Sequence, residues 1–309
     1  MDNVIVSSSP FIRKPLDINK MFLYVAIALT VPAIYGVMFF GLKSLLVIFV
    51  SLLTCFLSEC LFNFMNNKKF FVDNFSFFVT GLTLALTMPV NVPIIIVIAC
   101  AFFSIFIVKM AFGGLGRNKF NPALVGRCLA GVMSSAFASE IFKLTMNGEE
   151  FVSLTVGGTN SITNLVLGQA VGGIGTTCVL VALICCVFLV YSGVLDWKIP
   201  LISILSYFVV GQMINGLETN VINMFSGSFI FVSVFMITDP NTSPNTLIGK
   251  ILYSILFGVL SAVVWNWGYL GENSIFVVAL FVNMLVPFMD KYFVLKPMTL
   301  GGLRNAYKN

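Results

Sequence analysis

Long apolar segments separated by short polar connections make up most of this chain. A helix needs about 20 predominantly apolar residues to cross a bilayer, whereas a membrane-spanning β-strand gives a weaker, alternating pattern of about ten residues. The pattern here is helical, so we predict an all-α polytopic membrane protein of about ten transmembrane helices. Their approximate ranges are 21–40, 43–65, 75–88, 92–110, 122–138, 176–195, 199–217, 223–238, 248–270 and 274–290.

Basic residues gather at alternate connections, which predicts the orientation. With the amino terminus in the cytoplasm, all 17 Lys and Arg residues except Lys43 and Lys143 fall on the cytoplasmic side. Cytoplasmic loops of membrane proteins carry such an excess of basic residues. Both termini are therefore predicted to be cytoplasmic. Acidic residues mark the opposite side, namely Glu140, Glu149, Glu150, Glu218 and Glu272.

The predicted helices divide into two halves, 21–138 and 176–290. An extracytoplasmic segment, 139–175, joins them, and cytoplasmic tails of residues 1–20 and 291–309 flank them. A repeat with an odd number of helices inserts in opposite orientations, which produces an inverted-repeat fold. The stretch FVTGLTLALTMPVNVP in the first half is similar to FIFVSVFMITDPNTSP in the second. We therefore expect two inverted five-helix repeats.

Composition narrows the class of function. Only 9% of the residues are charged and 59% are hydrophobic, whereas about a quarter of a soluble domain is charged. There is no histidine, and none of the seven cysteines forms a C-x-x-C pair, which removes the usual zinc, haem and most iron–sulfur ligand sets. The cysteines are interpreted as small apolar residues. The scattered basic residues suggest no nucleic-acid role, and no Gly-rich dinucleotide motif is present.

One connection, FGGLGRNKFNPALVGR at residues 112–127, is richer in Gly and Asn than a simple turn requires. The amides of Asn118 and Asn121 suit a planar ligand with carbonyl and imide edges, such as a flavin. The nearby basic residues, Arg117, Lys119 and Arg127, would make this site electropositive. The structural alternative is a tight turn before a helix that begins at Pro122.

Two acidic residues are candidates for an ion pathway. Glu59 lies inside the second predicted helix, where an ionisable side chain is costly and marks a functional site by default. A structural hydrogen bond to a neighbouring helix is the alternative. Asp239, in MITDPNTSPNT, is typical of a helix end and turn, and equally of an ion or ligand site at the end of a discontinuous helix.

At these residues the chain resembles the D subunit (RnfD) of the Rnf electron-transport complex. It is also similar to the related B subunit of the Na⁺-translocating NADH:quinone oxidoreductase. The resemblance covers nearly the whole chain. It rests on SSSPFIR, TGLTLALTMP, FGGLGRNKFNPALVGR, GGIGTT, DWKIPL, FMITDPNTSP and VNMLVPFMDKY.

The resemblance implies flavin mononucleotide (FMN) esterified through its phosphate to a threonine near the outer membrane face. The family motif is approximately Asp-x-x-Ser/Thr-x-Ala-Thr-Pro-Leu, and GGTNSITNL places Thr163 at the attachment position. Only a hydroxyl can take the phosphoester. This chain departs from the motif at four positions, Gly157, Asn160, Ile162 and Asn164.

The resemblance further implies a second, non-covalent, riboflavin-like flavin at the cytoplasmic side, contacted by Asn118 and Asn121. The chain would then be an electron-carrying subunit, not catalytic alone, of a complex that couples ferredoxin:NAD electron transfer to Na⁺ or H⁺ movement. Its partners would be the other subunits, a flavin transferase and lipid of the bacterial cytoplasmic membrane. No catalytic side chain and no metal site are predicted.

Two other functions fit parts of the sequence. A channel or secondary transporter of the same fold without a redox role would suit the inverted repeats and Glu59, because fold alone does not determine function. A family member that has lost its covalent flavin and acts as a scaffold would suit the departures around Thr163.

Overall fold

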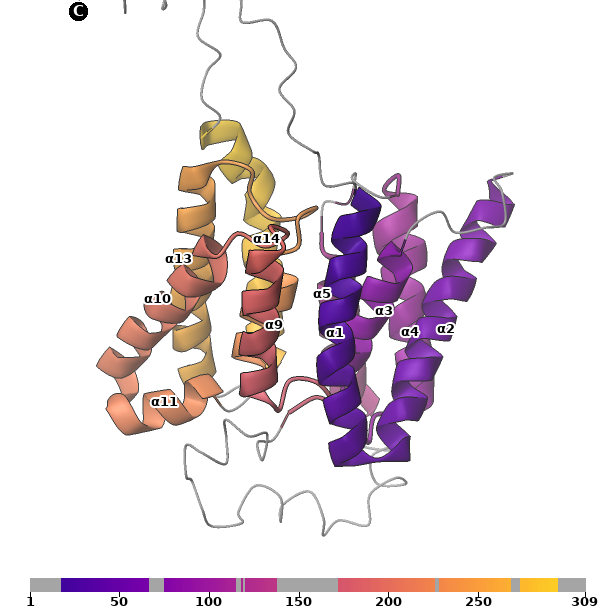
Figure 1. Cartoon of the computed structure of the whole chain (residues 1–309), viewed down its shortest axis with the longest axis horizontal. Coiled ribbons are helices and arrows are strands. Elements are labelled where there is room, and N and C mark those ends of the chain that lie inside the picture. Colours follow the sequence, from indigo (N-terminus) through magenta and orange to yellow (C-terminus); the bar gives the residue numbers. More distant parts are fainter. Residues whose placement is uncertain are drawn as a thin grey trace, which may run out of the picture.

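The computed structural model describes residues 18–66, 75–114, 118, 120–137, 172–225, 228–267 and 273–293. Within these residues all regular structure is helical, in line with the predicted class. The helices of the first half lie together on one side of the molecule, and those of the second half lie on the other (Figure 1). Thr163 lies outside the described residues.

The first half is built around a short helix, α3, that is enclosed by longer ones. Helix α2 packs against α3 and α4, and both α1 and α5 also contact α3. The elements are α1 (Ile18–Phe40), α2 (Leu42–Met65), α3 (Ser76–Thr87), α4 (Ile94–Phe102), its continuation as the π-helix η1 (Phe103–Ala111), and α5 (Pro122–Phe137).

The second half contains a corresponding short, irregular helix at its centre. Helix α10 packs along α13, and α13 packs along α14, while α9 contacts both α1 and the central helix. The elements are α9 (Val179–Tyr191), α10 (Lys198–Asn215), α11 (Leu217–Phe225), α12 (Phe229–Phe231) with its π-helical continuation η2 (Val232–Met236), α13 (Leu247–Trp267) and α14 (Asn273–Phe293).

Each of the ten predicted segments overlaps a helix, but the helices differ in length. By length and composition, six among the described residues suit a membrane crossing, and the bent pair Thr219–Phe225 and Phe229–Met236 would make a seventh. Three apolar helices are shorter: Ser76–Thr87, Pro122–Ser134 and Val179–Tyr191. Ten crossings, the inverted repeat and the orientation therefore stay predictions. Helix α1 begins, and α14 ends, on the same side of the bundle (Figure 1).

The long helices keep large apolar side chains on their outer faces. Met38, Leu42, Val187 and Met213 are each at least 70% exposed. In water such a surface would be unfavourable, whereas in a bilayer it contacts lipid of the same polarity. This exposure agrees with a multi-pass membrane protein.

Helix α3 ends against residues 173–175, at the end of the segment that joins the two halves. The N–H of Ile174 donates to Met88 O (2.9 Å) and that of Gly175 to Leu86 O (2.8 Å). A Cβ on Gly173 would lie 2.7 Å from the carbonyl carbon and oxygen of Thr87, so only glycine permits this approach. The GGIG sequence thus supplies donors that a helix end away from water requires.

Arg127 is placed differently from the prediction. We expected it at the cytoplasmic surface, as part of an electropositive flavin site, but its side chain is buried. Its Nε donates to Thr87 O (2.9 Å), and its guanidinium lies 4.5 Å from the centroid of the Phe276 ring. A cation is favourable there because the last carbonyl oxygens make this end of α3 the negative end of its helix dipole. Arg127 therefore stabilises the end of α3.

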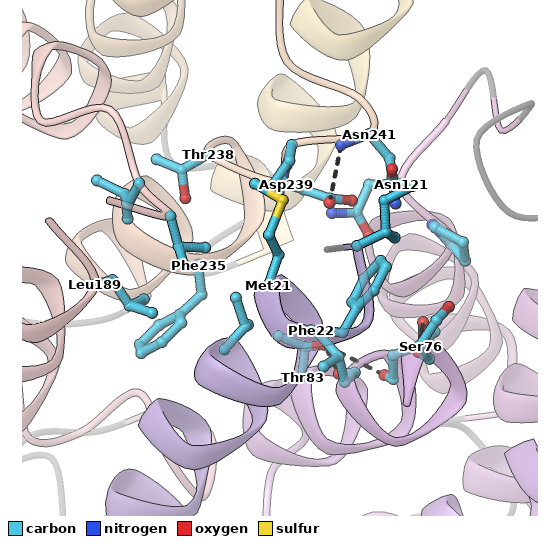
Figure 2. A pocket seen from close by; sticks show the side chains of 18 of the residues that line it. Met21, Phe22, Ser76, Thr83, Asn121, Leu189, Phe235, Thr238, Asp239 and Asn241 are labelled. Atoms are coloured by element: carbon cyan, nitrogen blue, oxygen red, sulfur yellow. Dashed lines mark hydrogen bonds between the residues drawn. The ribbon is translucent and has the colours of Figure 1, made fainter. Parts of the chain in front are cut away.

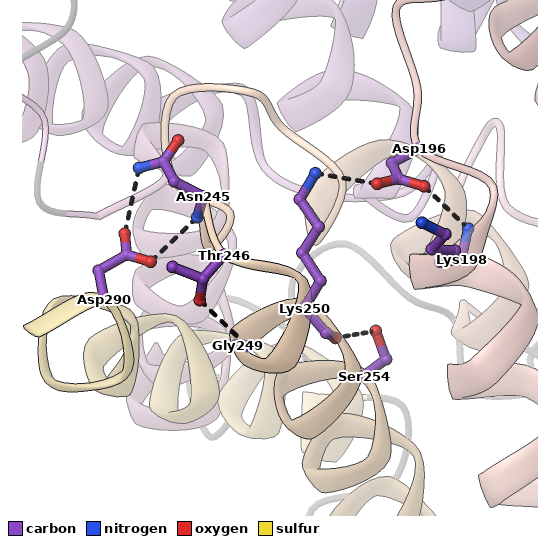
Figure 3. A network of polar contacts seen from close by, with 8 residues as sticks. All are labelled: Asp196, Lys198, Asn245, Thr246, Gly249, Lys250, Ser254 and Asp290. Atoms are coloured by element: carbon purple, nitrogen blue, oxygen red, sulfur yellow. Dashed lines mark hydrogen bonds and ion pairs between the residues drawn. The ribbon is translucent and has the colours of Figure 1, made fainter. Parts of the chain in front are cut away.

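Polar contacts connect the helix ends on the side where α14 ends (Figure 3). Asp290 accepts hydrogen bonds from the backbone N–H (3.0 Å) and the side-chain amide (3.1 Å) of Asn245. Lys250 pairs with Asp196 at 2.9 Å, with both side chains about one quarter exposed. These contacts hold the connections before α10 and α13 beside α13 and α14.

Candidate functional site

A pocket lies between the two halves of the molecule. Helices α1 and α3 and the connection before α5 line it from the first half, while α9, η2 and the turn after η2 line it from the second. Asn121, Asp239 and Asn241 lie together at one end, and Phe22, Leu189 and Phe235 lie along the remaining wall (Figure 2). The pocket thus combines a polar end with walls that are apolar except for hydroxyl side chains of α3, namely Ser76, Thr80 and Thr83. Small-molecule sites commonly combine apolar walls with a few polar groups.

Asn121 joins the two halves at the polar end of the pocket. Its Oδ1 accepts hydrogen bonds from the N–H groups of Ala123 (3.0 Å) and Leu124 (3.4 Å), which caps the start of α5. Its Nδ2 donates to Met236 O (3.1 Å) at the end of η2. The structural role that we considered for this residue is therefore present, and the residue also lines the pocket.

Asn118 uses its amide locally. In the amide orientation that satisfies both of its polar atoms, Nδ2 donates to Lys109 O (3.1 Å) and to Gly114 O (3.0 Å). The intervening chain turns sharply, with positive φ angles of 111° at Gly113 and 85° at Gly114, which glycine adopts most readily. Asn118 follows this turn in the sequence and lies in the wall of the same pocket.

The turn that contains Asp239 has the geometry that its sequence predicts. Asp239 Oδ1 accepts a hydrogen bond from Asn241 N (3.3 Å), and Oδ2 accepts one from the Thr242 hydroxyl (3.4 Å). Burial raises the pKa of Asp239 to about 6 from an ordinary 3.8, although these two hydrogen bonds act to lower it. The carboxyl group of Asp239 lines the pocket, so its protonation state depends on the groups that surround it there.

Asp239 is expected to make the stability of the protein depend on pH. Because its pKa is raised in the folded state, the folded protein binds the proton more tightly than the unfolded chain. Its contribution is then present below pH 4 and lost as the pH rises from about 4 to about 6. Asp239→Asn should remove this part of the pH dependence of the thermal midpoint.

Asp196→Asn provides a control, because Asp196 makes stability depend on pH with the opposite sign. Burial raises the pKa of Asp196, but hydrogen bonds from Lys250 and the N–H of Lys198 outweigh burial and lower it. Its contribution is present at neutral pH and lost as the pH falls. A pH profile that Asp239→Asn leaves unchanged would contradict the prediction.

The sequence of the whole site region matches one protein family. The sequence model of the NQR2, RnfD, RnfE family matches residues 5–299. The chain belongs to this family.

Two relatives illustrate how closely this member of the NQR2, RnfD, RnfE family resembles named D subunits. The chain is 28% identical to the D subunit of the proton-translocating ferredoxin:NAD(+) oxidoreductase complex of Clostridium ljungdahlii, with 97% of this chain and 96% of the relative covered. It is 29% identical to the D subunit of the Na(+)-translocating ferredoxin:NAD(+) oxidoreductase complex of Acetobacterium woodii, with 94% and 93% covered.

A third relative comes from the quinone-reductase branch of the family. The chain is 28% identical to the B subunit of the Na(+)-translocating NADH-quinone reductase of Pseudoalteromonas atlantica. Here 72% of this chain and 60% of the relative are covered. The chain matches the two D subunits over nearly their whole length and the B subunit over only part of it. These matches agree with the resemblances to the D subunit and to the B subunit that the motifs indicated.

In this family member the structure brings together three of the five predicted site residues. Asn118, Asn121 and Asp239 line one pocket, although they lie far apart in the sequence. Glu59 lies elsewhere: its Oε2 is 2.6 Å from Lys109 Nζ, and the two side chains are 9% and 2% exposed. Thr163 lies outside the described residues.

Sequence reasoning missed the roles of two residues, one beside the pocket and one in the separate Glu59 pair. Asn283, fully buried in α14, accepts a hydrogen bond from Asn121 N (3.2 Å) and donates to Thr242 O (3.1 Å). It therefore connects the FGGLGRNKFNPALVGR stretch, through Asn121, to the MITDPNTSPNT stretch, through Thr242. Lys109, which we had assigned to the cytoplasmic surface, is buried beside Glu59. A polar residue inside an apolar helix was the available signal for Asn283.

Proposed function

We propose that the chain is a flavin-carrying membrane subunit of an ion-translocating oxidoreductase complex that transfers electrons between ferredoxin and NAD. The pocket between the two halves is the observation that supports this most. Its amides from Asn118 and Asn121, its half-buried Asp239 and its apolar walls are the groups that a planar ring with polar edges requires. Relatives that match along nearly their whole length are named as D subunits of proton- or Na(+)-translocating ferredoxin:NAD(+) oxidoreductase complexes, which supports the complex and the reaction.

We assign the pocket to the non-covalent, riboflavin-like flavin. Its donor and acceptor set fits the carbonyl and imide edges of the ring. The cavity encloses about 80 Å³, less than the roughly 300–1,000 Å³ of typical small-molecule sites, so the ring must displace wall side chains such as Met21 and Phe235. Both side chains line the pocket wall (Figure 2). When bound, a flavin accepts and donates one or two electrons.

We assign the covalent FMN to Thr163, through a phosphoester made by a flavin transferase. This assignment follows from the resemblance and from the register of GGTNSITNL. The orientation predicted from the basic residues puts Thr163 outside the membrane, and the pocket near the cytoplasmic ends of α1 and α3. Two flavins on opposite faces would let electrons cross the bacterial cytoplasmic membrane through this subunit, between cofactors of its partner subunits.

We assign ion movement to two carboxylates of the helix bundle, those of Glu59 and Asp239. Glu59 lies within a membrane-spanning helix and is paired, as ionisable groups in the membrane interior usually are. Asp239 lies at the end of the discontinuous element η2, where transporters place coupling-ion sites. Either residue would carry Na⁺ or H⁺.

A channel or secondary transporter without a redox role is the second candidate. Two short central helices from opposite halves, and a buried ion pair beside one of them, are also features of transporters. Bound flavin separates the two functions, because only the first requires it.

The decisive experiment measures acid-extractable flavin in variants of the two asparagines. Losing one hydrogen bond to the ring costs roughly 1–3 kcal/mol, or about one to two decades of affinity. Asn118→Ala is the cleaner variant, because the described bonds of its amide are to Lys109 O and Gly114 O, whereas the Asn121 amide also caps α5. Purified Asn118→Ala, and more strongly the double variant Asn118→Ala, Asn121→Ala, should lose extractable flavin and keep covalent flavin.

Two controls distinguish a flavin site from a structural turn. Asn66→Ala removes another amide that donates to a nearby backbone carbonyl, that of Phe62, outside the pocket, and should leave both flavins unchanged. Asn121→Asp keeps the acceptor that caps α5 and loses the donor. Wild-type flavin content in Asn118→Ala and in the double variant, or failure of both to assemble, would show that the asparagines are structural.

A further inference from the structure

Glu59 and Lys109 form an ion pair within two candidate membrane-spanning helices. Lys109 Nζ lies 2.6 Å from Glu59 Oε2, and both residues are buried. Glu59 lies six residues before the end of α2 and Lys109 two residues before the end of η1. At 1.5 Å per residue, Glu59 is roughly 9 Å inside the end of its helix, away from the surface.

The Lys109 ammonium occupies the place that a cation bound to Glu59 would take. A carboxylate away from water requires a compensating positive charge, and one ammonium or one monovalent cation supplies it equally well. The ionisable neighbours of the pair on α2 are Cys55 and Cys60, so no second carboxylate among the described residues provides another negative charge. Lys109 and a mobile cation therefore compete for one carboxylate.

We propose that Lys109 is a built-in counter-cation, which keeps Glu59 closed to the transported monovalent cation until the Lys109 ammonium moves away. This inference rests on the proposed role of Glu59 in the ion pathway. It adds that the site opens by displacement of Lys109. Lys109 is thus a positioning residue, and Glu59 is the group that binds the cation.

The backbone of Lys109 links this ion pair to the pocket. Lys109 O accepts hydrogen bonds from Gly114 N (3.0 Å) and from Asn118 Nδ2 (3.1 Å), and Asn118 lines the pocket. Lys109 also lies in a π-helix, whose wide turns often occur at functional sites. A ring that draws the Asn118 amide away would remove one hydrogen bond from the backbone carbonyl of Lys109, whose ammonium pairs with Glu59.

Labelling of Glu59 with dicyclohexylcarbodiimide tests the competition directly. This apolar reagent adds to a protonated carboxyl group, whose O–H proton moves to a carbodiimide nitrogen as the oxygen bonds to the central carbon. In the wild-type complex the Lys109 ammonium occupies the Glu59 carboxylate, so Glu59 should stay unlabelled. In Lys109→Met no fixed cation remains beside the carboxyl group, so Glu59 should label roughly tenfold faster or more. Mass spectrometry of the Glu59 peptide measures the rate.

Added cations then identify what replaces Lys109. If Na⁺, but not K⁺, slows labelling of Lys109→Met, the site takes Na⁺. If labelling follows pH alone, the site takes protons. Both outcomes support the proposal. Equal labelling of wild type and Lys109→Met, or equal Na⁺ protection of both, would overturn it.

Matched variants separate this role from a structural one. Lys109→Arg keeps the charge and should behave like wild type, while Lys250→Met removes a lysine from the other described ion pair and should not change Glu59 labelling. Lys109→Gln is a second neutral variant. If Lys109→Met and Lys109→Gln both fail to assemble while Glu59→Gln, Lys109→Met assembles, the pair is only structural and the proposal is wrong.

The labelling result is independent of electron transfer and of flavin content. If the complex moves no cation but the labelling pattern is as expected, the ion-pathway function of Glu59 fails. The competition between Lys109 and a cation for the Glu59 carboxylate then still holds. If the complex moves cations but substitution of Lys109 does not change the labelling of Glu59, only the proposal about Lys109 fails, and the ion-pathway function is not contradicted.

Discussion

Thr163→Ala is expected to abolish covalent flavin in this protein completely. Alanine has no hydroxyl, so no phosphoester can form at that position, whatever the transferase recognises. Protein made with its native transferase should lose all flavin fluorescence on a denaturing gel and remain inserted in the membrane. Mass spectrometry of the peptide that contains residue 163 measures the modification directly.

Neighbouring hydroxyl residues provide the controls for this result. Thr163→Ser keeps a hydroxyl and should keep some covalent flavin, while Thr159→Ala and Ser161→Ala should keep it fully. An unmodified Thr163 in the wild-type protein would instead favour the scaffold interpretation, and flavin lost from Ser161→Ala would move the attachment to that residue.

Glu59→Gln is expected to cause the largest loss of stability. It leaves the Lys109 ammonium, 2% exposed, without its carboxylate partner. Breaking a buried ion pair from one side costs about 3–5 kcal/mol, because the remaining charge is uncompensated, whereas replacing both partners with neutral side chains is often nearly neutral. The thermal midpoint of Glu59→Gln should therefore fall well below that of wild type, and Glu59→Gln, Lys109→Met should recover most of the difference.

The second described ion pair provides the matched comparison. Asp196→Asn breaks the Lys250–Asp196 pair, which is about one quarter exposed and 2.9 Å long, and a pair near water contributes about 0–1 kcal/mol. If Glu59→Gln costs no more than Asp196→Asn, then Glu59 and Lys109 experience a polar environment in which an unpaired ammonium remains solvated.

Hydrophobic pattern by itself determined the class of fold and the position of its helices. A lipid-facing or buried helix must be apolar over most of its length, and its polar connections then stand out clearly. Each of the ten predicted segments overlaps a helix for this reason. The same contrast identified Asn118, Asn121 and Asp239, because Gly-, Asn- and Pro-rich turns are conspicuous between apolar runs.

Only the tertiary structure decided which of these residues work together. The pairs Glu59–Lys109, Arg127–Thr87 and Asn121–Asn283 join helices that are separated by up to 162 residues. In the sequence each of these pairs is marked only by a single polar residue. The residues around it do not indicate its partner, because the partner lies far away in the sequence. Charge counting placed Lys109 and Arg127 at the membrane surface, since it treats every basic residue near a helix end as solvated. In the fold, a buried carboxylate and a helix carbonyl compensate them instead, because a charge in a low-dielectric interior is stable only beside an opposite charge or dipole.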